Sequence, residues 1–384
     1  MRLDNIHTIE DLRLAAKRRL PRVIFDFIDG GAGDEQGLNN NAAQFKNYRL
    51  VPRYLVDTSQ RSQKTILFGR EYESMFGIAP TGYAGLWRPG GEEMLAKAAA
   101  ETGIPFVQSG SSVASVEAIG RVARGNAWFQ LYAARSPDTS ADILRRAADS
   151  GVETVAVTVD LPVPGPRPRD ARSGWHIPPK MTPKIMLDGI LHPRWTWGYF
   201  TSGGLPKMGN WAPYAGDGAD AVAIARFMRQ NAYSAQTWSD IERYRKIWSG
   251  NLILKGILHA DDARRASDIG VDGIIVSNHG GRQFERAPAP IEVLPGIVEA
   301  VGSRLTVMMD SGISQGVDML IAYALGAKFV FVGRATAWGV IAGGVEGAKR
   351  AISILKNQID LAMGQVGCNG PGELCDVTLL RVER

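Results

Sequence analysis

Eight short runs of β-branched and aromatic residues recur along this chain, and each is followed by a stretch with helical periodicity. Most are spaced by roughly 22–32 residues, which suits βα units in a parallel sheet. Eight such units predict an α/β protein with a closed (β/α)8 (TIM) barrel, and a doubly wound sheet is the alternative. The runs cover 76–80, 105–109, 127–132, 154–160, 251–257, 273–280, 305–310 and 327–333.

Nearly every run closes on a polar or reactive group. Loop polarity alone would account for two or three such endings, but hardly for eight. The carboxyl ends of barrel strands open onto one mouth, which is where barrel enzymes place their active sites. We therefore expect a catalytic site built from the endings, which are Pro80-Thr81, Ser109, Gln130 with Tyr132, Thr158 with Asp160, Lys255, Asn278-His279, Asp310 and Gly333-Arg334.

A helical segment of about 70 residues precedes the first run. Residues 8–20 carry a helix-capping signal, Thr8 with Asp11, and a second short helix is expected over 22–28. We expect residues 1–384 to form a single barrel domain that begins with this segment.

A long insertion at 161–250 separates the fourth and fifth strands, far beyond an ordinary βα loop. Helices are expected near 220–232 and 238–247. The insertion is rich in aromatic and basic side chains, which favours either a lid over the barrel or a membrane-interface segment. These side chains are Trp195, Trp197, Tyr199, Phe200, Trp211, Tyr214, Lys180, Lys184, Arg194 and Lys207.

The net charge of +5 suits an anionic substrate, an anionic cofactor or a membrane surface. The cations form no tract or stripe, so no nucleic-acid partner is expected. No apolar run approaches the roughly 20 residues that span a bilayer, and no signal segment is evident, so we expect a cytoplasmic protein. The two cysteines, Cys368 and Cys375, lack metal-ligand spacing; we expect free thiols and no metal site.

The strongest local motif is Ser277-Asn278-His279-Gly280-Gly281-Arg282. It places an imidazole and a guanidinium three residues apart just after a strand. His279 can take a proton from a hydroxyl, and Arg282 can grip a carboxylate with two hydrogen bonds. A structural histidine in a loop is the alternative for His279.

One further strand ending and the loop after it fit this chemistry. Asp160 would orient an imidazole and stabilise its protonated form, although a helix N-cap is the alternative. Arg167 and Arg169 follow in a proline-stiffened loop that suits a positioned arginine, the alternative being an exposed charged turn.

Lys255 ends the fifth run, where a charged amine inside a barrel is costly unless it meets an anion. The negative charge of a reduced flavin is one such anion; a Schiff-base lysine and a pair with a strand-end aspartate are the alternatives. The glycine turns at 310–312 and 333–334 follow the last two strands and favour a phosphate site. No GxGxxG follows a strand, so no nicotinamide-binding unit is predicted.

Taken together, these residues resemble the FMN-dependent L-2-hydroxy-acid oxidase and dehydrogenase family, which includes glycolate oxidase, L-lactate dehydrogenase and (S)-mandelate dehydrogenase. The resemblance covers almost the whole chain, and the SNHGGRQ stretch is highly specific. The segment 187–195 is similar to the membrane-associated mandelate and lactate dehydrogenases more than to the soluble oxidases.

The resemblance implies a role for each matching position. His279 would be the base with Asp160 as its partner, Arg282 and Arg167 would bind the substrate carboxylate, and Tyr132 would contact the substrate hydroxyl or keto oxygen. The implied FMN-binding residues are Thr81, Ser109, Gln130, Thr158 and Lys255 at the isoalloxazine ring, Asp310, Gly312, Gly333 and Arg334 at the ribityl chain and phosphate, and Pro80 and Gly82 beside Thr81.

Two positions depart from the family pattern. Phe27 stands where the family usually has a tyrosine that donates to the substrate carboxylate, a hydrogen bond worth roughly 1.5–3 kcal/mol. This favours a larger, more apolar 2-hydroxy acid or a modified acid group. Ser314 stands where many members have an arginine on the phosphate, so Arg334 and backbone N–H groups would take that role.

The implied reaction is FMN-dependent oxidation of an L-2-hydroxy acid to a 2-keto acid, with electrons passed to a quinone or to oxygen. Proton removal from the hydroxyl with hydride transfer and removal from Cα both stay open. We also expect a homo-oligomer, a tetramer, with a peripheral contact on the inner face of the cell membrane. The alternative function is an FMN-dependent barrel enzyme acting on a peptide-borne substrate or catalysing a non-redox isomerisation.

Overall fold

Eight parallel strands close into a barrel in the computed structural model, which describes residues 3–123, 125–176, 180–202, 204–232 and 235–382. Neighbouring strands follow chain order, and β11 pairs with β4 to complete the ring. The predicted (β/α)8 barrel is therefore confirmed and the doubly wound sheet is wrong. The strands are β4 Phe76–Ile78, β5 Phe106–Ser109, β6 Ala127–Leu131, β7 Thr154–Thr158, β8 Asn251–Ile257, β9 Gly273–Val276, β10 Thr306–Met309 and β11 Phe329–Val332.

Apolar side chains fill the barrel interior. A hairpin of β2 (Thr65–Leu67) and β3 (Arg70–Tyr72) joins this cluster, and Trp128 Nε1 donates to the Tyr72 hydroxyl at 3.2 Å. Phe68 in its turn lies against Gly273, the first residue of β9, so the hairpin covers the amino-terminal end of the barrel. The opposite, carboxyl-terminal end is left for the site. The interior residues are Ala79, Val107, Trp128, Ala156, Ile253, Ile275, Met308, Phe329 and Phe331.

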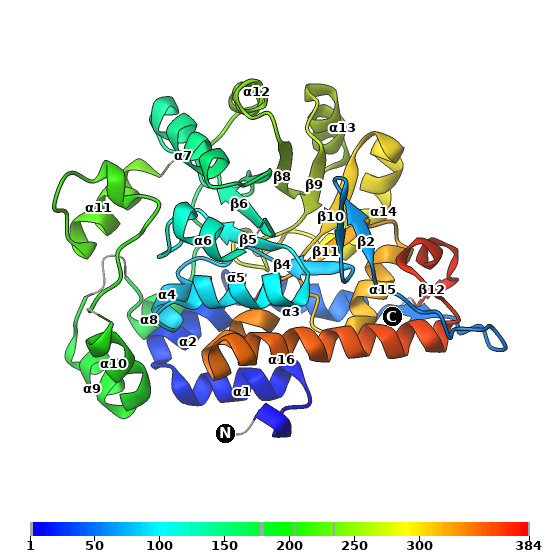
Figure 1. Ribbon diagram of the computed structural model, residues 1–384, viewed down its shortest axis with the longest axis horizontal. Helices are drawn as coiled ribbons and strands as arrows, with labels where there is room; N and C mark the ends of the chain where they lie inside the picture. Colours follow the sequence, from blue (N-terminus) through cyan, green and yellow to red (C-terminus); the bar gives the residue numbers. More distant parts are fainter. Residues whose placement is uncertain (1–2, 124, 177–179, 203, 233–234, 383–384) are drawn as a thin grey trace.

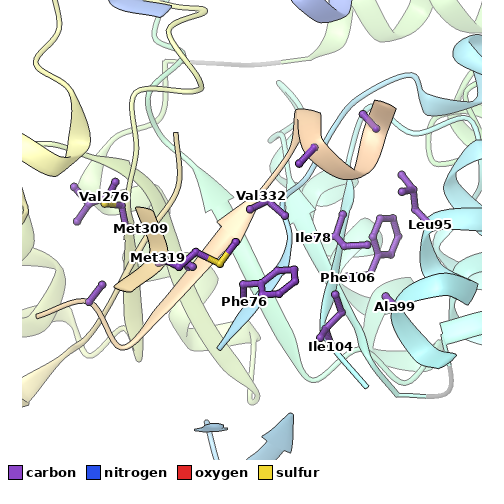
Figure 2. Close-up of a cluster of buried hydrophobic side chains, with 14 of the residues drawn as sticks. Phe76, Ile78, Leu95, Ala99, Ile104, Phe106, Val276, Met309, Met319 and Val332 are labelled. Carbon is purple, nitrogen blue, oxygen red and sulfur yellow. The ribbon is translucent and has the colours of Figure 1, made fainter. Parts of the chain in front are cut away.

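A second apolar layer lies between the strands and the outer helices. Figure 2 shows Ile78 and Phe106 from adjacent strands meeting Leu95 and Ala99 of the following helix. Burying one such Leu, Ile or Phe side chain contributes about 1.5–3 kcal/mol. The outer helices are α5 Gly91–Thr102, α6 Val116–Ala123, α7 Pro137–Asp149, α12 Trp238–Ile247, α13 Ala260–Ile269, α14 Pro290–Val301, α15 Gly316–Ala324 and α16 Arg334–Val366.

The amino-terminal segment wraps the barrel with helices α1 (Ile9–Arg19), α2 (Arg22–Asp29) and α3 (Gln36–Phe45). The predicted capping box at the start of α1 is confirmed, because Thr8 and Asp11 each accept a hydrogen bond from the other's backbone amide. Helix α1 runs alongside α16, which is broken at Gly344 (Figure 1). The two chain ends meet where β1 (Tyr48–Leu50) pairs with β12 (Leu379–Arg381).

The insertion between β7 and β8 forms a set of short helices that project to one side (Figure 1). Positions 177–179, 203 and 233–234 of the predicted insertion lie outside the described residues. The helices expected near 220–232 and 238–247 are confirmed as α11 and α12. The insertion helices are α8 Pro168–Ser173, α9 Pro183–Leu191, α10 Pro193–Thr201 and α11 Ala221–Asn231.

The aromatic residues of the insertion divide into buried and exposed sets. Trp197 and Phe200 are 70% and 76% exposed, whereas Trp211 is 1% exposed and packs with Met208 and Met228. For Trp211 the membrane-interface alternative is wrong, because this tryptophan closes a small core of the insertion. Among the described residues, no helix is long and apolar enough to cross a membrane.

Candidate active site

A cavity of about 1530 Å³ opens at the carboxyl-terminal mouth of the barrel. Twelve of the sixteen residues predicted for the site line it. They are Pro80, Thr81, Gly82, Tyr132, Arg167, Lys255, His279, Arg282, Asp310, Gly312, Gly333 and Arg334. The other four are not among the lining residues: Ser109 and Thr158 end β5 and β7, Gln130 is the penultimate residue of β6, and Asp160 follows β7.

His279 stands between two partners from other strand ends. Its Nδ1 lies 3.0 Å from Asp160 Oδ1, and its Nε2 lies 3.4 Å from the Tyr132 hydroxyl. Asp160 is not a helix N-cap, since α8 begins after Arg167. The ring thus has one nitrogen held by a carboxylate and the other turned to a phenol in the cavity.

The charges of this pair suit a base. Burial lowers the pKa of His279 below its ordinary value, and attraction to Asp160 offsets only part of this effect. Burial would raise the pKa of Asp160, but His279 and then Lys255 hold it below its ordinary value. At neutral pH His279 is therefore neutral beside an ionised carboxylate, and a proton taken at Nε2 would be stabilised by Asp160.

The backbone around His279 is strained into place. His279 has φ 60°, a left-handed conformation that costs a non-glycine residue roughly 1–3 kcal/mol. Its amide donates to Ser277 Oγ at 3.0 Å. Gly281 also has a positive φ and lies so close to α3 that a Cβ would approach the Leu38 amide nitrogen to 2.5 Å. The glycines of the motif thus let the loop press against α3 while His279 faces the cavity.

Lys255 is buried at the cavity floor. Its Nζ lies 3.0 Å from Asp310 Oδ2 and donates to Ser277 Oγ at 2.9 Å. Burial alone would lower the pKa of Lys255, but Asp310 and Asp160 outweigh it and raise the pKa. The amine therefore stays protonated, which fits the alternative of a strand-end aspartate partner and disfavours a Schiff-base nucleophile. Because it lines the cavity, it can also face an anion there.

Several arginines line the cavity. Arg282 Nη1 donates to the carbonyls of Phe27 and Gly30 at 2.6 and 2.7 Å, and Arg167 Nε donates to the Arg282 carbonyl at 3.3 Å. Burial lowers the pKa of Arg282 well below its ordinary value, and the charges of Arg167 and Arg334 add to this. Guanidiniums crowded in this way are stabilised by an anionic ligand.

A buried carboxylate, Asp170, lies beside these arginines, with its Oδ2 4.0 Å from Arg167 Nη1. Burial raises the pKa of Asp170 to about 6, against the opposing charges of Arg282 and Arg167. Arg169 forms its ion pairs with other carboxylates, Asp26 at 3.0 Å and Asp29 at 2.8 Å. Arg169 therefore fastens α8 to α2 and does not form an exposed charged turn.

Aromatic rings close one side of the cavity. Phe27 stacks on Trp175 with ring centroids 3.9 Å apart and meets Tyr83 edge-on at 5.7 Å. The Arg282 guanidinium lies over the Phe27 ring, 4.8 Å from its centroid. In place of a hydroxyl donor, Phe27 thus contributes an apolar wall and a support for Arg282.

The glycine turns form the far end of the cavity. Arg334 donates to the carbonyls of Ile28, Gly30 and Gly280, so its donors hold backbone while its charge faces the cavity. The amides of Ser314 and Gln315 are both taken by Asp318. The amides that open α16 have no partner within that helix. An anion bound here would thus meet those amides and the charge of Arg334.

The polar residues in strands β5, β6 and β7 suit a planar heterocycle with donors and acceptors at its edge. Gln130 Nε2 and Thr158 Oγ1 are buried and have no hydrogen-bond partner among the described residues. Ser109 Oγ donates to Gln130 Oε1 at 3.2 Å. Leaving such atoms unpaired costs about 1–3 kcal/mol each. These orphaned groups, the cationic Lys255 and the charge of Arg334 at the far end of the cavity suit FMN.

Several residues of the site were not predicted from the sequence. Ser277 was visible in the histidine motif, but its bonds to Lys255 and His279 were not. Asp170 follows the proline-stiffened loop and offered its charge as a signal. Tyr83 and Trp175 carried no signal, because their place depends on how α2 and α8 pack.

Comparisons with known proteins agree with this geometry. A sequence profile described as FMN-dependent dehydrogenase matches residues 16–380. An L-lactate dehydrogenase of Caulobacter sp. (strain K31) is 38% identical over 379 residues, covering 99% of this chain and 100% of that protein. The (S)-mandelate dehydrogenase of Pseudomonas putida is 37% identical over 364 residues, covering 95% and 91%.

Solved structures are similar over the same extent. The crystal structure of the monotopic membrane protein (S)-mandelate dehydrogenase superposes with a TM-score of 0.93 at 36% identity, covering 98% of this chain and 100% of that one. A mandelate oxidase structure superposes with a TM-score of 0.85 at 34% identity, covering 99% and 100%.

Proposed function

This chain belongs to the FMN-dependent dehydrogenase family, and from that premise we propose that it oxidises an L-2-hydroxy acid to the 2-keto acid with FMN as its cofactor. One observation carries the proposal. His279 is held by Asp160 on one nitrogen and faces Tyr132 with the other, in a cavity that also contains Arg167 and Arg282. The carboxyl-terminal mouth of the barrel thus holds both a proton acceptor and an anion site.

Each of these side chains has a distinct task. Arg167 and Arg282 bind the substrate carboxylate. Tyr132 donates to the substrate oxygen; burial raises the pKa of its hydroxyl, so it stays protonated. His279 Nε2 takes the proton, and Asp160 stabilises the imidazolium that results. FMN, when bound, supplies the acceptor for the two electrons that leave the substrate.

The proposed FMN-binding residues are those that the resemblance to the family implies. Lys255 places its positive charge where a reduced flavin is negative, while Gln130 and Thr158 offer their unpaired polar atoms. The full set is Pro80, Thr81, Gly82, Ser109, Gln130, Thr158, Lys255, Asp310, Gly312, Gly333 and Arg334.

The aromatic side chains of the cavity indicate the kind of side chain that the substrate carries. Phe27, Trp175 and Tyr83 line the cavity beside the arginines, which favours a 2-hydroxy acid with a large apolar side chain over lactate or glycolate. The intact arginine pair and His279–Asp160 pair disfavour the alternative of isomerisation or a peptide-borne substrate.

A direct experiment is anaerobic titration of the purified yellow protein with a panel of L-2-hydroxy acids. Loss of the flavin absorbance near its long-wavelength maximum, with formation of the 2-keto acid, is the expected result. Aryl and branched substrates should bleach the flavin faster than lactate. A colourless protein, or a flavin that no 2-hydroxy acid reduces, would overturn the proposal.

A membrane contact would explain the exposed hairpin of α9 and α10, which we name the apolar hairpin. None of the α9 side chains is buried, and basic residues flank the pair. Apolar and aromatic residues beside cations suit the interface of an anionic bilayer. The exposed apolar residues of this region are Met181, Met186, Leu187, Ile190, Leu191, Trp197, Phe200 and Leu205.

We propose that the apolar hairpin rests on the inner face of the cell membrane and that a quinone accepts the electrons. The similar (S)-mandelate dehydrogenase is described as a monotopic membrane protein, which supports this placement. The reduced enzyme should be reoxidised faster by a short-chain quinone than by oxygen. A homotetramer stays an expectation, to be checked by light scattering.

A further inference from the structure

Three arginines lie on segments that meet at the foot of the apolar hairpin, where it leaves the barrel. Arg19 ends α1, Arg88 follows helix α4 (Ala84–Trp87), and Arg194 lies in the first turn of α10. We name them the arginine cluster. Figure 1 shows α9 and α10 next to the α1–α2 end of the molecule.

Specific contacts bring these segments together. Trp195 Nε1 donates to the Leu86 carbonyl at 3.0 Å, which places the start of α10 on α4. A Cβ at Gly198 would lie 3.6 Å from Pro89 Cγ, and Arg194 lies one turn before Gly198 on the same face of α10. Arg194 therefore lies on the face of α10 that packs against the segment carrying Arg88.

The turn between α1 and α2 joins the same place. The Arg22 amide donates to Asp188 Oδ2 of α9 at 2.6 Å, only three residues after Arg19. The same Asp188 side chain lies 3.2 Å from His192. Asp188 thus binds the Arg22 amide and His192, and it forms no ion pair with the described side chains of the arginine cluster.

Arg88 is fixed by the break in α16. Gly344 has φ 65° and interrupts the helix, and Arg88 Nη1 donates to the Ile341 carbonyl at 3.2 Å. A Cβ at Gly344 would lie 3.5 Å from Arg88 Cζ. The guanidinium is thus packed on the broken turn and held in position.

These charges lack a counter-ion. Within the part of the chain that the structure describes, neither Arg19 nor Arg194 has a carboxylate within ion-pair distance, and Arg88 has only the Ile341 carbonyl. Burial lowers the pKa of Arg19 and of Arg88, and the charges of Arg194 and Arg19, respectively, lower them further. Arg19 and Arg88 are thus partly desolvated cations without a carboxylate partner, a setting that an anion would stabilise.

We infer that Arg19, Arg88 and Arg194 bind the phosphate of an anionic phospholipid headgroup at the foot of the apolar hairpin. The inference rests on the proposed membrane contact. The exposed side chains of α9 and α10 would enter the acyl region, so a phosphate at the hairpin's base would lie at headgroup depth. Guanidiniums match a phosphate with paired hydrogen bonds.

A soluble lipid tests the site without a bilayer. Dihexanoylphosphatidylglycerol, kept below its micelle concentration, should bind the holoenzyme saturably in isothermal titration calorimetry. The double variant Arg19→Gln with Arg194→Gln should weaken this binding by about tenfold or more. A matched control, Arg18→Gln with Lys184→Gln, removes the same charge from exposed neighbours and should stay within about threefold of the wild type. Flavin content and circular dichroism check that each variant is folded.

Each other outcome is informative. No saturable binding, or equal loss in both double variants, would overturn the headgroup site, since attraction would then be diffuse. Equal affinity for inorganic phosphate would assign the cluster to a free anion and overturn the lipid inference. The membrane contact itself is tested separately by co-sedimentation with vesicles of phosphatidylcholine and phosphatidylglycerol, where Trp197→Ser with Phe200→Ser should release the protein. Loss of the headgroup site with retained vesicle binding thus leaves the proposed function standing.

Discussion

His279 Nδ1 and Asp160 Oδ1 lie 3.0 Å apart across the barrel mouth, although 119 residues separate them in the chain. Asp160 follows β7 and His279 follows β9, so β8 and the whole insertion lie between them in sequence. The closed barrel brings both strand ends to one rim. This contact therefore depends on the fold and links the base to the carboxylate that stabilises its protonated form.

Replacing Asp160 tests this link. Asp160→Asn keeps the size of the side chain but removes the charge that stabilises the imidazolium, and it can hold the ring in the wrong tautomer. Flavin reduction in stopped-flow experiments should slow by about 10²- to 10⁴-fold. FMN content should be unchanged. Reduction within a few-fold of the wild-type rate would show that Asp160 is only structural.

Lys255 should tune the flavin. Its charged amine would stabilise the negative charge of the reduced cofactor, and a charge-assisted hydrogen bond contributes about 1.5–3 kcal/mol. Lys255→Met should therefore lower the two-electron midpoint potential by about 30–60 mV. Spectroelectrochemical titration of the FMN-loaded variant measures this shift. An unchanged potential in a fully loaded variant would contradict the placement of Lys255 at the flavin.

Ser314 lines the end of the cavity where we place the phosphate. Ser314→Arg adds a guanidinium there, and a hydrogen bond to a charged group contributes about 1.5–3 kcal/mol. The variant should therefore lower the FMN dissociation constant by about tenfold to a hundredfold. Flavin fluorescence on rebinding to apoprotein measures the constant. Ser314→Gln, without the charge, serves as control and should change affinity little. Equal behaviour of both variants would place the phosphate elsewhere.

The raised pKa of Asp170 predicts that the stability of the folded protein depends on pH. Arg167 and Arg169 of its own segment, Arg282 of the loop after β9 and Asp26 of α2 face it, and burial raises the pKa of Asp170 to about 6. A raised carboxyl pKa means that the folded state binds the proton more tightly, so ionised Asp170 destabilises the fold above pH 6. This penalty disappears as pH falls below the unfolded pKa near 3.9.

At pH 8, Asp170→Asn should accordingly increase the free energy of unfolding by up to about 3 kcal/mol. The melting temperature should rise with it. The difference from the wild type should shrink as the pH falls from 6 to 4. Thermal denaturation of the holoenzyme across this range measures it. A variant that is less stable at pH 8 would show that ionised Asp170 supports the arginines more than its burial costs.

Periodicity and strand-end chemistry in the sequence were enough to predict the barrel. Runs of buried β-branched and aromatic residues mark each strand because both faces of a barrel strand are covered. The capping box at Thr8 and Asp11 is a local hydrogen-bond pattern, so it too was readable. His279, Asp160 and the arginines were predictable because a barrel must gather its strand ends.

Other features depend on packing between distant segments. The stacking of Phe27 on Trp175 requires α2 and the residues after α8 to meet, and no periodicity specifies that meeting. Trp211 looked like an interfacial residue by composition, but Met208 and Met228 bury it. The role of Arg334 as a clamp on three carbonyls likewise follows only from the position of α2.

The most direct test of the account is the rate of flavin reduction in His279→Ala. Wild-type enzyme mixed anaerobically with an aryl L-2-hydroxy acid should bleach in a single turnover, and the FMN-loaded variant should be slower by about 10³- to 10⁴-fold. His259→Ala, at an exposed histidine outside the cavity, should reduce at the wild-type rate. A His279→Ala enzyme that bleaches at a near-normal rate would contradict the assignment of His279 as the base.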